Sequence, residues 1–127
     1  MDDKKKILMI DDDTFFTSII TNTFAKHGCE TRVAGSGEAG LDAARKEKPD
    51  FILLDMAMTG MDGLQTLAAL KKDPTTADVP VAIFSGSAGQ DDEGKHEQAK
   101  KLGAVDYLEK MQFTPEQLWE HLSQYLK

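Results

Sequence analysis

Short apolar runs alternate along this chain with longer segments in which apolar residues recur every three or four positions. Three runs, 7–10, 51–54 and 79–84, are continuous, which is typical of strands buried on both faces of a parallel sheet. Two less apolar segments, 31–34 and 104–109, complete a set of five predicted strands. Strands that alternate with helices indicate an α/β protein whose parallel sheet is covered on both faces.

The helical segments lie between these strands and carry start and stop signals. Gly28 is a natural stop for the first helix, and Thr114 followed by Pro115 marks the start of the last. The segment 88–102 is nearly all polar, so its helix is expected to lie lightly on the surface. The predicted helices lie at about 16–27, 36–47, 64–73, 88–102 and 114–126.

Length and composition are those of one domain. The chain has 127 residues, of which 40% are hydrophobic and 29% charged, and it contains no linker, repeat or low-complexity tract. We therefore predict a single domain over 1–127. No apolar run approaches the roughly 18 residues of a membrane span. Because no long apolar segment follows the charged start of the chain, we expect no signal peptide and a cytoplasmic location.

Net charge and cysteine content exclude several classes of protein. The formal net charge is −7, and the only arginines are Arg32 and Arg45. Because proteins that bind nucleic acid need clustered basic residues, we do not expect direct nucleic-acid binding. The single Cys29 excludes a disulfide framework and a multi-cysteine metal site, and we expect it to be a small, semi-buried residue.

Polar residues stand where four of the predicted strands end. The carboxyl ends of parallel strands meet in one crevice, where ligands bind. Converging carboxylates there would repel one another without a cation, and an all-oxygen set favours Mg²⁺ over zinc. A lysine and a hydroxyl suit a phosphoryl group, and aspartate can accept one covalently, so the crevice indicates a Mg²⁺-dependent aspartyl-phosphate site. The residues are Asp11, Asp12, Asp13, Asp55, Ser85 and Lys110.

Each of these residues taken alone also has an ordinary structural explanation. A run of aspartates after a strand often forms a turn and caps the next helix. A single serine or lysine near a strand end is commonly solvated. The functional interpretation depends on their joint placement, because four separate strand ends carry the residue types that this chemistry requires.

The same residues carry a resemblance to the receiver domains of two-component response regulators. The stretch 7–13 resembles the first-strand motif of that family, and 54–63 resembles its phosphoacceptor motif. The resemblance covers essentially the whole chain, and the length is similar to that of the single-domain chemotaxis type. It implies a flavodoxin-like (βα)5 receiver fold with strand order 2-1-3-4-5.

The resemblance also implies a role for each residue of the crevice. Asp55 would be the phosphoacceptor. Asp12, Asp55 and the backbone carbonyl of Ala57 would bind Mg²⁺, and Asp11 would act through a bound water.

Two further positions match the signalling elements of the family. Ser85 would be the switch hydroxyl and Tyr107 the aromatic residue that changes its exposure with it, while Lys110 would pair with the phosphoryl group. The donor would be a sensor histidine kinase or a phosphotransfer protein. A downstream protein would bind the face made by the fourth helix, fifth strand and fifth helix. Such a protein is not an enzyme beyond its own phosphorylation and dephosphorylation.

The chain departs from the family pattern at two positions. Thr59 stands where the family usually has proline, and Met111 stands where the family has a proline in a cis bond after the lysine. We therefore expect a trans bond and a more mobile loop after Lys110. Ala57 and Ser87 are expected to tune the lifetime of the phosphoryl group.

Trp119 and the three histidines lie outside this crevice. Trp119 lies outside the apolar stripe of the last helix, so it is either an interface anchor or a half-buried packing residue. His27, His96 and His121 are expected to be isolated surface residues.

Three alternatives to a working receiver are compatible with parts of this pattern. The first is an unphosphorylated pseudo-receiver that acts only as an interaction module. A haloacid-dehalogenase-type phosphatase is disfavoured because residues 111–127 contain no aspartate and the chain leaves no room for a cap domain. A flavodoxin-like cofactor binder is disfavoured because aspartates after the first strand would repel a phosphate.

Overall fold

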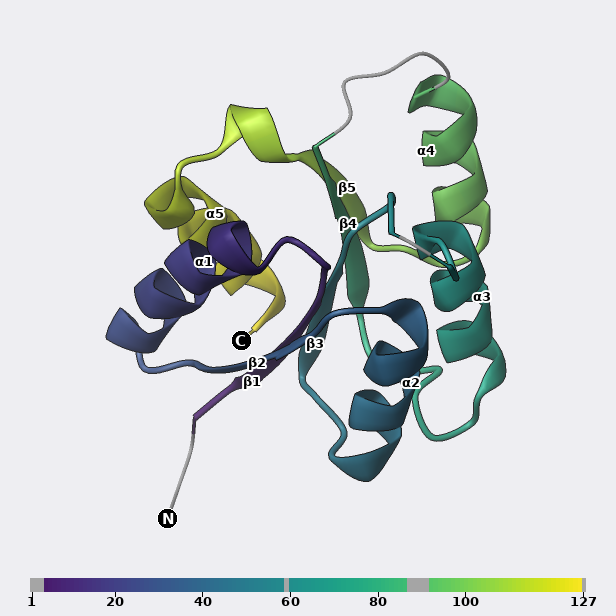
Figure 1. The fold of residues 1–127 in the computed structure, drawn as a ribbon, viewed down its shortest axis with the longest axis horizontal. Coiled ribbons are helices and arrows are strands. Elements are labelled where there is room, and N and C mark those ends of the chain that lie inside the picture. Colours follow the sequence, from purple (N-terminus) through teal and green to yellow (C-terminus); the bar gives the residue numbers. More distant parts are fainter. Residues whose placement is uncertain (1–3, 59, 87–91, 127) are drawn as a thin grey trace.

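A computed structural model describes residues 4–58, 60–86 and 92–126 (Figure 1). It contains a sheet of five parallel strands in the order β2-β1-β3-β4-β5, which confirms the predicted α/β class and strand order. The strands are β1 (Lys6–Ile10), β2 (Glu30–Ala34), β3 (Phe51–Leu54), β4 (Val81–Ser85) and β5 (Asp106–Glu109).

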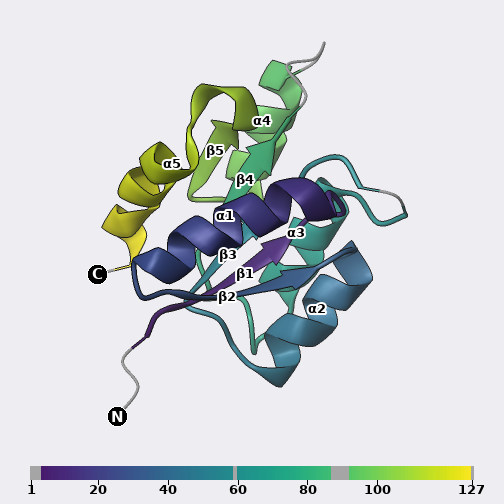
Figure 2. The ribbon, with the colours of Figure 1, turned by 60° about the vertical axis from the view of Figure 1, so that its left-hand side comes forward.

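Helices cover both faces of this sheet. Helices α1 and α5 lie on one face, and α2, α3 and α4 lie on the other (Figure 1). Figure 2 shows α1 in front of the sheet, beside α5. The helices are α1 (Thr14–Lys26), α2 (Gly37–Lys46), α3 (Gly63–Lys72), α4 (Asp92–Lys101) and α5 (Pro115–Leu122), with 3₁₀ turns η1 (Lys110–Gln112) and η2 (Ser123–Tyr125).

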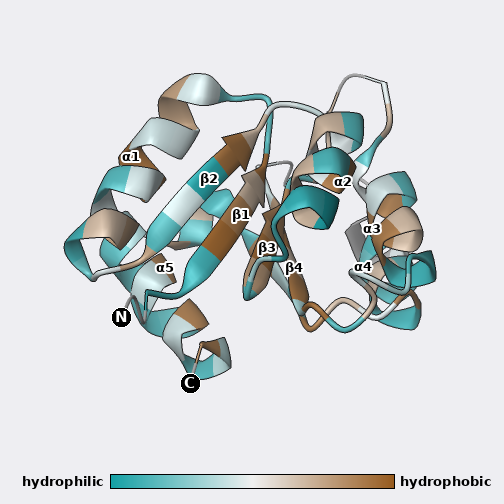
Figure 3. Ribbon diagram, turned by 90° about the horizontal axis from the view of Figure 1, so that it is seen from below, coloured by the Kyte–Doolittle hydropathy of each residue, from teal (hydrophilic) through white to brown (hydrophobic). Residues whose placement is uncertain are grey.

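The central strands have apolar side chains on both faces, which explains their continuous apolar runs. Successive side chains of a strand point to opposite faces. In β1, Leu8 and Ile10 pack under α2, α3 and α4, whereas Ile7 and Met9 pack under α1 and α5. The hydrophobic colouring of β1, β3 and β4 in Figure 3 follows from this double burial.

Side chains cap the starts of three helices, among them Thr114, which the sequence indicated as the start of the last helix. Ser36 accepts a hydrogen bond from the backbone N–H of Ala39 at the start of α2. Asp62 and Thr114 each form a reciprocal capping box, at the starts of α3 and α5. Gly28 has φ +81° just beyond α1, as expected of a stop.

Two predicted strands begin later than expected. β4 starts at Val81 rather than at 79, because Pro80 has no N–H to donate to the ladder. β5 starts at Asp106 rather than at 104. Ala104 instead donates its N–H to the carbonyl of Ala99, at 3.0 Å, and so still belongs to the turn that closes α4.

Helix α4 lies lightly on the surface, as its polar sequence predicted. Among its described side chains only Ala99 is buried. The described part of the chain contains no helix long and apolar enough to cross a bilayer.

Candidate functional site

Three carboxylates and one ammonium group meet at the carboxyl edge of the sheet. Asp11, Asp12 and Asp55 each offer an oxygen, and these oxygens lie within 4.8 Å of one another. Asp11 and Asp55 are buried, while Asp12 is exposed. The Nζ of Lys110 lies 2.6 Å from Asp11 Oδ2 and 3.9 Å from Asp55 Oδ1. We call Asp11, Asp12, Asp55 and Lys110 the carboxylate cluster.

The sheet itself fixes the two buried carboxylates. The N–H of Asp11 donates to the carbonyl of Ala34, and that of Asp55 donates to the carbonyl of Ile10, both at 2.9 Å. Each ladder thus continues one residue beyond its strand. The backbone of both aspartates is therefore positioned by the sheet.

The three consecutive aspartates divide their roles. Asp11 points inward, Asp12 is exposed at the rim, and Asp13 caps α1 by accepting from the N–H of Phe16 at 3.0 Å. The N–H of Asp13 donates to Asp11 Oδ1, also at 3.0 Å. For Asp13 the ordinary explanation as a helix cap therefore holds.

Burial and like charge make the Asp55 carboxylate unfavourable in the bare protein. Burial, and then the negative charge of Asp11, raise its pKa from 3.8 to about 6. The positive charge of Lys110 and the N–H of Ala57, 3.4 Å from Asp55 Oδ1, oppose that rise in pKa without cancelling it. The cluster therefore has excess negative charge that a bound cation would neutralise.

The donor set fits Mg²⁺. It consists of carboxylate oxygens, which are the ligands that hard divalent cations prefer. Ala57 lies beside Asp55 through the hydrogen bond of its N–H, so residue 57 is close to the predicted metal site.

Lys110 reaches the cluster from the first residue of η1, directly after β5. Only 13% of its side chain is exposed. Its nearest carboxylate is Asp11 rather than Asp55. The peptide bonds of the described residues are all trans, as expected for Lys110–Met111, and the Met111 side chain is 87% exposed.

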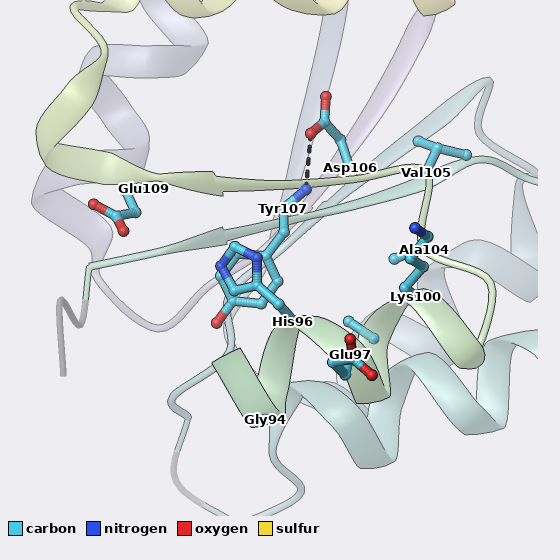
Figure 4. Close-up of a pocket in the computed structure, with 10 residues that line it drawn as sticks. Gly94, His96, Glu97, Lys100, Ala104, Val105, Asp106, Tyr107 and Glu109 are labelled. Atoms are coloured by element: carbon cyan, nitrogen blue, oxygen red, sulfur yellow. Dashed lines mark hydrogen bonds between the residues drawn. The ribbon is translucent and has the colours of Figure 1, made fainter. Parts of the chain in front are cut away.

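Ser85 and Tyr107 lie on the neighbouring strands β4 and β5. Ser85 is buried at the end of β4, and Tyr107 is partly buried against the α2–α4 side of the core. The Tyr107 ring stacks on His96 of α4, with ring centroids 3.6 Å apart (Figure 4). The two rings lie in a groove between α4 and β5 that Lys100 also lines.

His27 and His96 are exposed, as expected of surface histidines, and His121 is partly buried, but the expectation that the three are isolated is wrong. His27 forms an ion-pair contact with Glu116 at 2.7 Å and stacks on Trp119 at 4.8 Å. His121 contacts Asp106 at 2.7 Å, and His96 stacks on Tyr107. Trp119 is itself half-buried, so of its two interpretations the packing role holds.

Phe16, which the sequence placed only at the start of the first predicted helix, also lies near the site. Its ring centroid lies 4.6 Å from the Nζ of Lys110. Its position in the first turn of the helix that follows Asp13 is the sequence feature that could have indicated its closeness to the site. Thr59 and Ser87, two other residues singled out from the sequence, lie outside the described residues.

Comparison with known proteins gives the same family from sequence. A profile of the response regulator receiver domain matches residues 7–123. Protein PilH of Pseudomonas aeruginosa is 37% identical over 105 residues, which cover 83% of this chain and 84% of that protein. Sporulation initiation phosphotransferase F of Bacillus subtilis is 31% identical over 122 residues, or 96% of this chain and 94% of that one.

Solved structures agree with the fold. The chemotaxis protein CheY4 of Vibrio cholerae superimposes with a TM-score of 0.86 at 25% identity, covering 96% of this chain and 98% of that one.

Some relatives are much longer than the match. The chain spans only 22% of the response regulator PleD of Caulobacter vibrioides, which is 34% identical over the shared 105 residues.

Proposed function

The chain belongs to the response regulator receiver domain family, and from this premise we propose that it is a switch operated by phosphorylation of Asp55. The observation that carries the proposal is the placement of a buried aspartate with a raised pKa beside two other carboxylates and a lysine. A buried carboxylate with excess negative charge around it is suited to binding a cation and accepting a phosphoryl group.

The proposed donor is a phosphohistidine of a sensor histidine kinase or a phosphotransfer protein. An oxygen of Asp55 bonds to phosphorus as the P–N bond breaks, and the leaving imidazole nitrogen keeps the electron pair and takes up a proton. The Lys110 ammonium, 3.9 Å from Asp55 Oδ1, pairs with the oxygens of the incoming group. Water later attacks phosphorus, which releases inorganic phosphate and restores the carboxylate.

Asp12, Asp55 and the backbone carbonyl of Ala57 would hold Mg²⁺, with Asp11 acting through a bound water. When bound, Mg²⁺ would supply positive charge that offsets the negative charge of the phosphoryl oxygens. The Ala57 side chain is exposed next to the phosphoacceptor and is proposed to tune how long the phosphoryl group lasts.

The output of the switch is proposed to pass through Ser85 and Tyr107. The Ser85 hydroxyl would bind the phosphoryl group, and the Tyr107 ring would then turn inward beside it. For such a change, phosphorylation has to alter the free-energy difference between two existing conformations by only a few kcal/mol, on the order of other population shifts. A downstream protein would read the face made by α4, β5 and α5.

Other parts of the proposal concern the protein as a whole. Residues 1–127 would act as one domain, and the chain would have no enzymatic activity beyond its own phosphorylation and dephosphorylation. A cytoplasmic location is included, because kinases form phosphohistidine from ATP inside the cell.

The test is the intact mass of the protein after incubation with a small acyl phosphate, with and without Mg²⁺. The expected result is one Mg²⁺-dependent phosphoryl adduct in the wild type and none in Asp55→Asn. Asp62→Asn, which changes an aspartate outside the cluster, is the matched control and should form the adduct. A wild type without an adduct would refute the proposal and favour the unphosphorylated interaction module.

A further inference from the structure

We propose that Phe16 is a positioning residue whose ring holds the Lys110 ammonium against the carboxylate cluster. The inference rests on the proposed function of Asp55 as phosphoacceptor. It concerns how this chain places its lysine, which is the group that must reach the oxygens of the phosphoryl group.

The ammonium group of Lys110 lies near two aromatic rings and next to an acidic side chain. Its Nζ is 4.6 Å from the ring centroid of Phe16 and 6.0 Å from that of Phe84. The two rings contact each other, with centroids 5.6 Å apart and planes inclined at 41°. The same nitrogen is 2.6 Å from Asp11 Oδ2. An ammonium within about 6 Å of an aromatic ring face is attracted to it, and more strongly where water is excluded.

The element that carries Lys110 supplies little restraint of its own. η1 is a turn of three residues, and the two that follow Lys110 in it, Met111 and Gln112, are exposed. Met111, the next residue, is almost fully exposed. Because a lysine side chain is a flexible four-carbon stem, contacts from other elements must limit where its charge lies. Those contacts come from Asp11, which follows β1, and from the rings of Phe16 on α1 and Phe84 on β4.

Phe16 is itself connected to the carboxylate cluster by a series of contacts that begins and ends at Asp11. The N–H of Asp13 donates to Asp11 Oδ1, and the N–H of Phe16 donates to Asp13 Oδ1. The Phe16 ring faces the Lys110 ammonium, which donates to Asp11 Oδ2. The ring is therefore placed by the same aspartate run that forms the acidic side of the site.

The Phe16 ring suits the Lys110 ammonium because this charge has to pair first with Asp11 and then with the oxygens of the phosphoryl group. The attraction of an ammonium to a ring is less directional than a hydrogen bond. Lys110 can therefore move from Asp11 toward the oxygens on Asp55 while it stays over Phe16. The ammonium has three N–H donors, so those that do not face the ring remain available to oxygens.

The experiment compares Phe16→Leu and Phe16→Tyr with Phe15→Leu as the matched control. Phe15 is the preceding residue of the same helix turn, and its side chain is 77% exposed. The first readout is the NMR chemical shift of the Lys110 ε-methylene in Mg²⁺-free protein, which a facing ring displaces. The second is the rate of phosphorylation by a small acyl phosphate, with the maximal rate separated from the KM for the donor.

Support would be a Phe16→Leu protein that folds, loses the displaced Lys110 signal, and is phosphorylated about three- to tenfold more slowly at saturating donor. Phe16→Tyr should restore both readouts, because it keeps the ring, and Phe15→Leu should match the wild type. A merely structural role would lower stability without this pattern of rescue.

Two results would overturn the proposal in distinguishable ways. If the wild type is phosphorylated and Phe16→Leu matches its rate, the proposal on Phe16 fails and the proposed function stands. If the wild type forms no adduct at all, the proposed function fails, and the positioning role that rests on it fails too.

Discussion

Replacement of Asp55 by asparagine is expected to stabilise the Mg²⁺-free protein at neutral pH. The reason is the excess negative charge around this buried carboxylate, which burial and Asp11 impose and Lys110 only partly offsets. Asparagine has nearly the same shape and carries no charge. The substitution therefore removes an unfavourable charge while leaving the packing of the site in place.

The size of the effect follows from the difference in pKa between the folded and unfolded states. The pKa is about 6 in the folded protein, against an ordinary value of 3.8. Below pH 3.8 the Asp55 carboxyl is protonated in both the folded and the unfolded state, so it adds no pH dependence to the free energy of unfolding. Between 3.8 and about 6 only the unfolded state loses it, so stability falls as pH rises. At about 1.4 kcal/mol per pKa unit, the full penalty above pH 6 is about 3 kcal/mol.

The assay is urea denaturation of the wild type and Asp55→Asn from pH 3.5 to pH 8 in the presence of a chelator. The variant should be more stable by about 3 kcal/mol at pH 8, and the difference should shrink toward zero near pH 3.5. The control is Asp73→Asn, because the hydrogen bond from Arg45 lowers the pKa of Asp73 to about 2 and its loss should destabilise the protein. A difference for Asp55→Asn that is negative, or that does not change with pH, would refute the reasoning.

Three further predictions test the surroundings of the site. Lys110→Met removes an attraction that lowers the pKa of Asp55, so NMR titration of that carboxyl should give a pKa above about 6; an equal or lower value would contradict this. Gly63→Ala places a Cβ 2.5 Å from the Asp55 carbonyl oxygen and should cost about 1–3 kcal/mol in urea denaturation, whereas Gly35→Ala, which meets no atom within 4 Å, is the control and should cost less. Asp62→Ala removes the cap of α3 and should cost about 1 kcal/mol by the same measurement, and an unchanged midpoint would count against it.

The positions of the strands along the chain could be predicted because burial produces a sequence pattern that does not depend on distant contacts, whereas their order in the sheet was implied by the family resemblance. A run such as 51–54 is continuous only if both faces of its strand are covered, and all four of its residues are buried. The meeting of Asp11, Asp55 and Lys110 then followed from parallel topology alone, since such strands end at one edge.

Side-chain partners could not be predicted in the same way. Whether Lys110 lies nearer to Asp11 or to Asp55 depends on differences of about 1 Å that packing decides. The contact between His27 and Glu116 joins residues 89 positions apart, and no local pattern marks it. The exact start of β5 was also missed, because the turn after α4 continues through Ala104 by a hydrogen bond that only the folded helix provides.

Ala99 is the one buried residue among the described side chains of α4, and this has a consequence for how the protein can unfold in part. Ala99 contributes little apolar area, whereas every residue from Ile7 to Ile10 in β1 is almost fully buried. Helices with few buried contacts open in fluctuations that leave the remaining structure intact. Amide hydrogens of α4 should therefore exchange with solvent through local opening, and those of β1 only when the whole sheet unfolds. The edge of the protein that carries His96 can thus rearrange at a free energy set by one helix, while the sheet that holds Asp11 and Asp55 stays fixed.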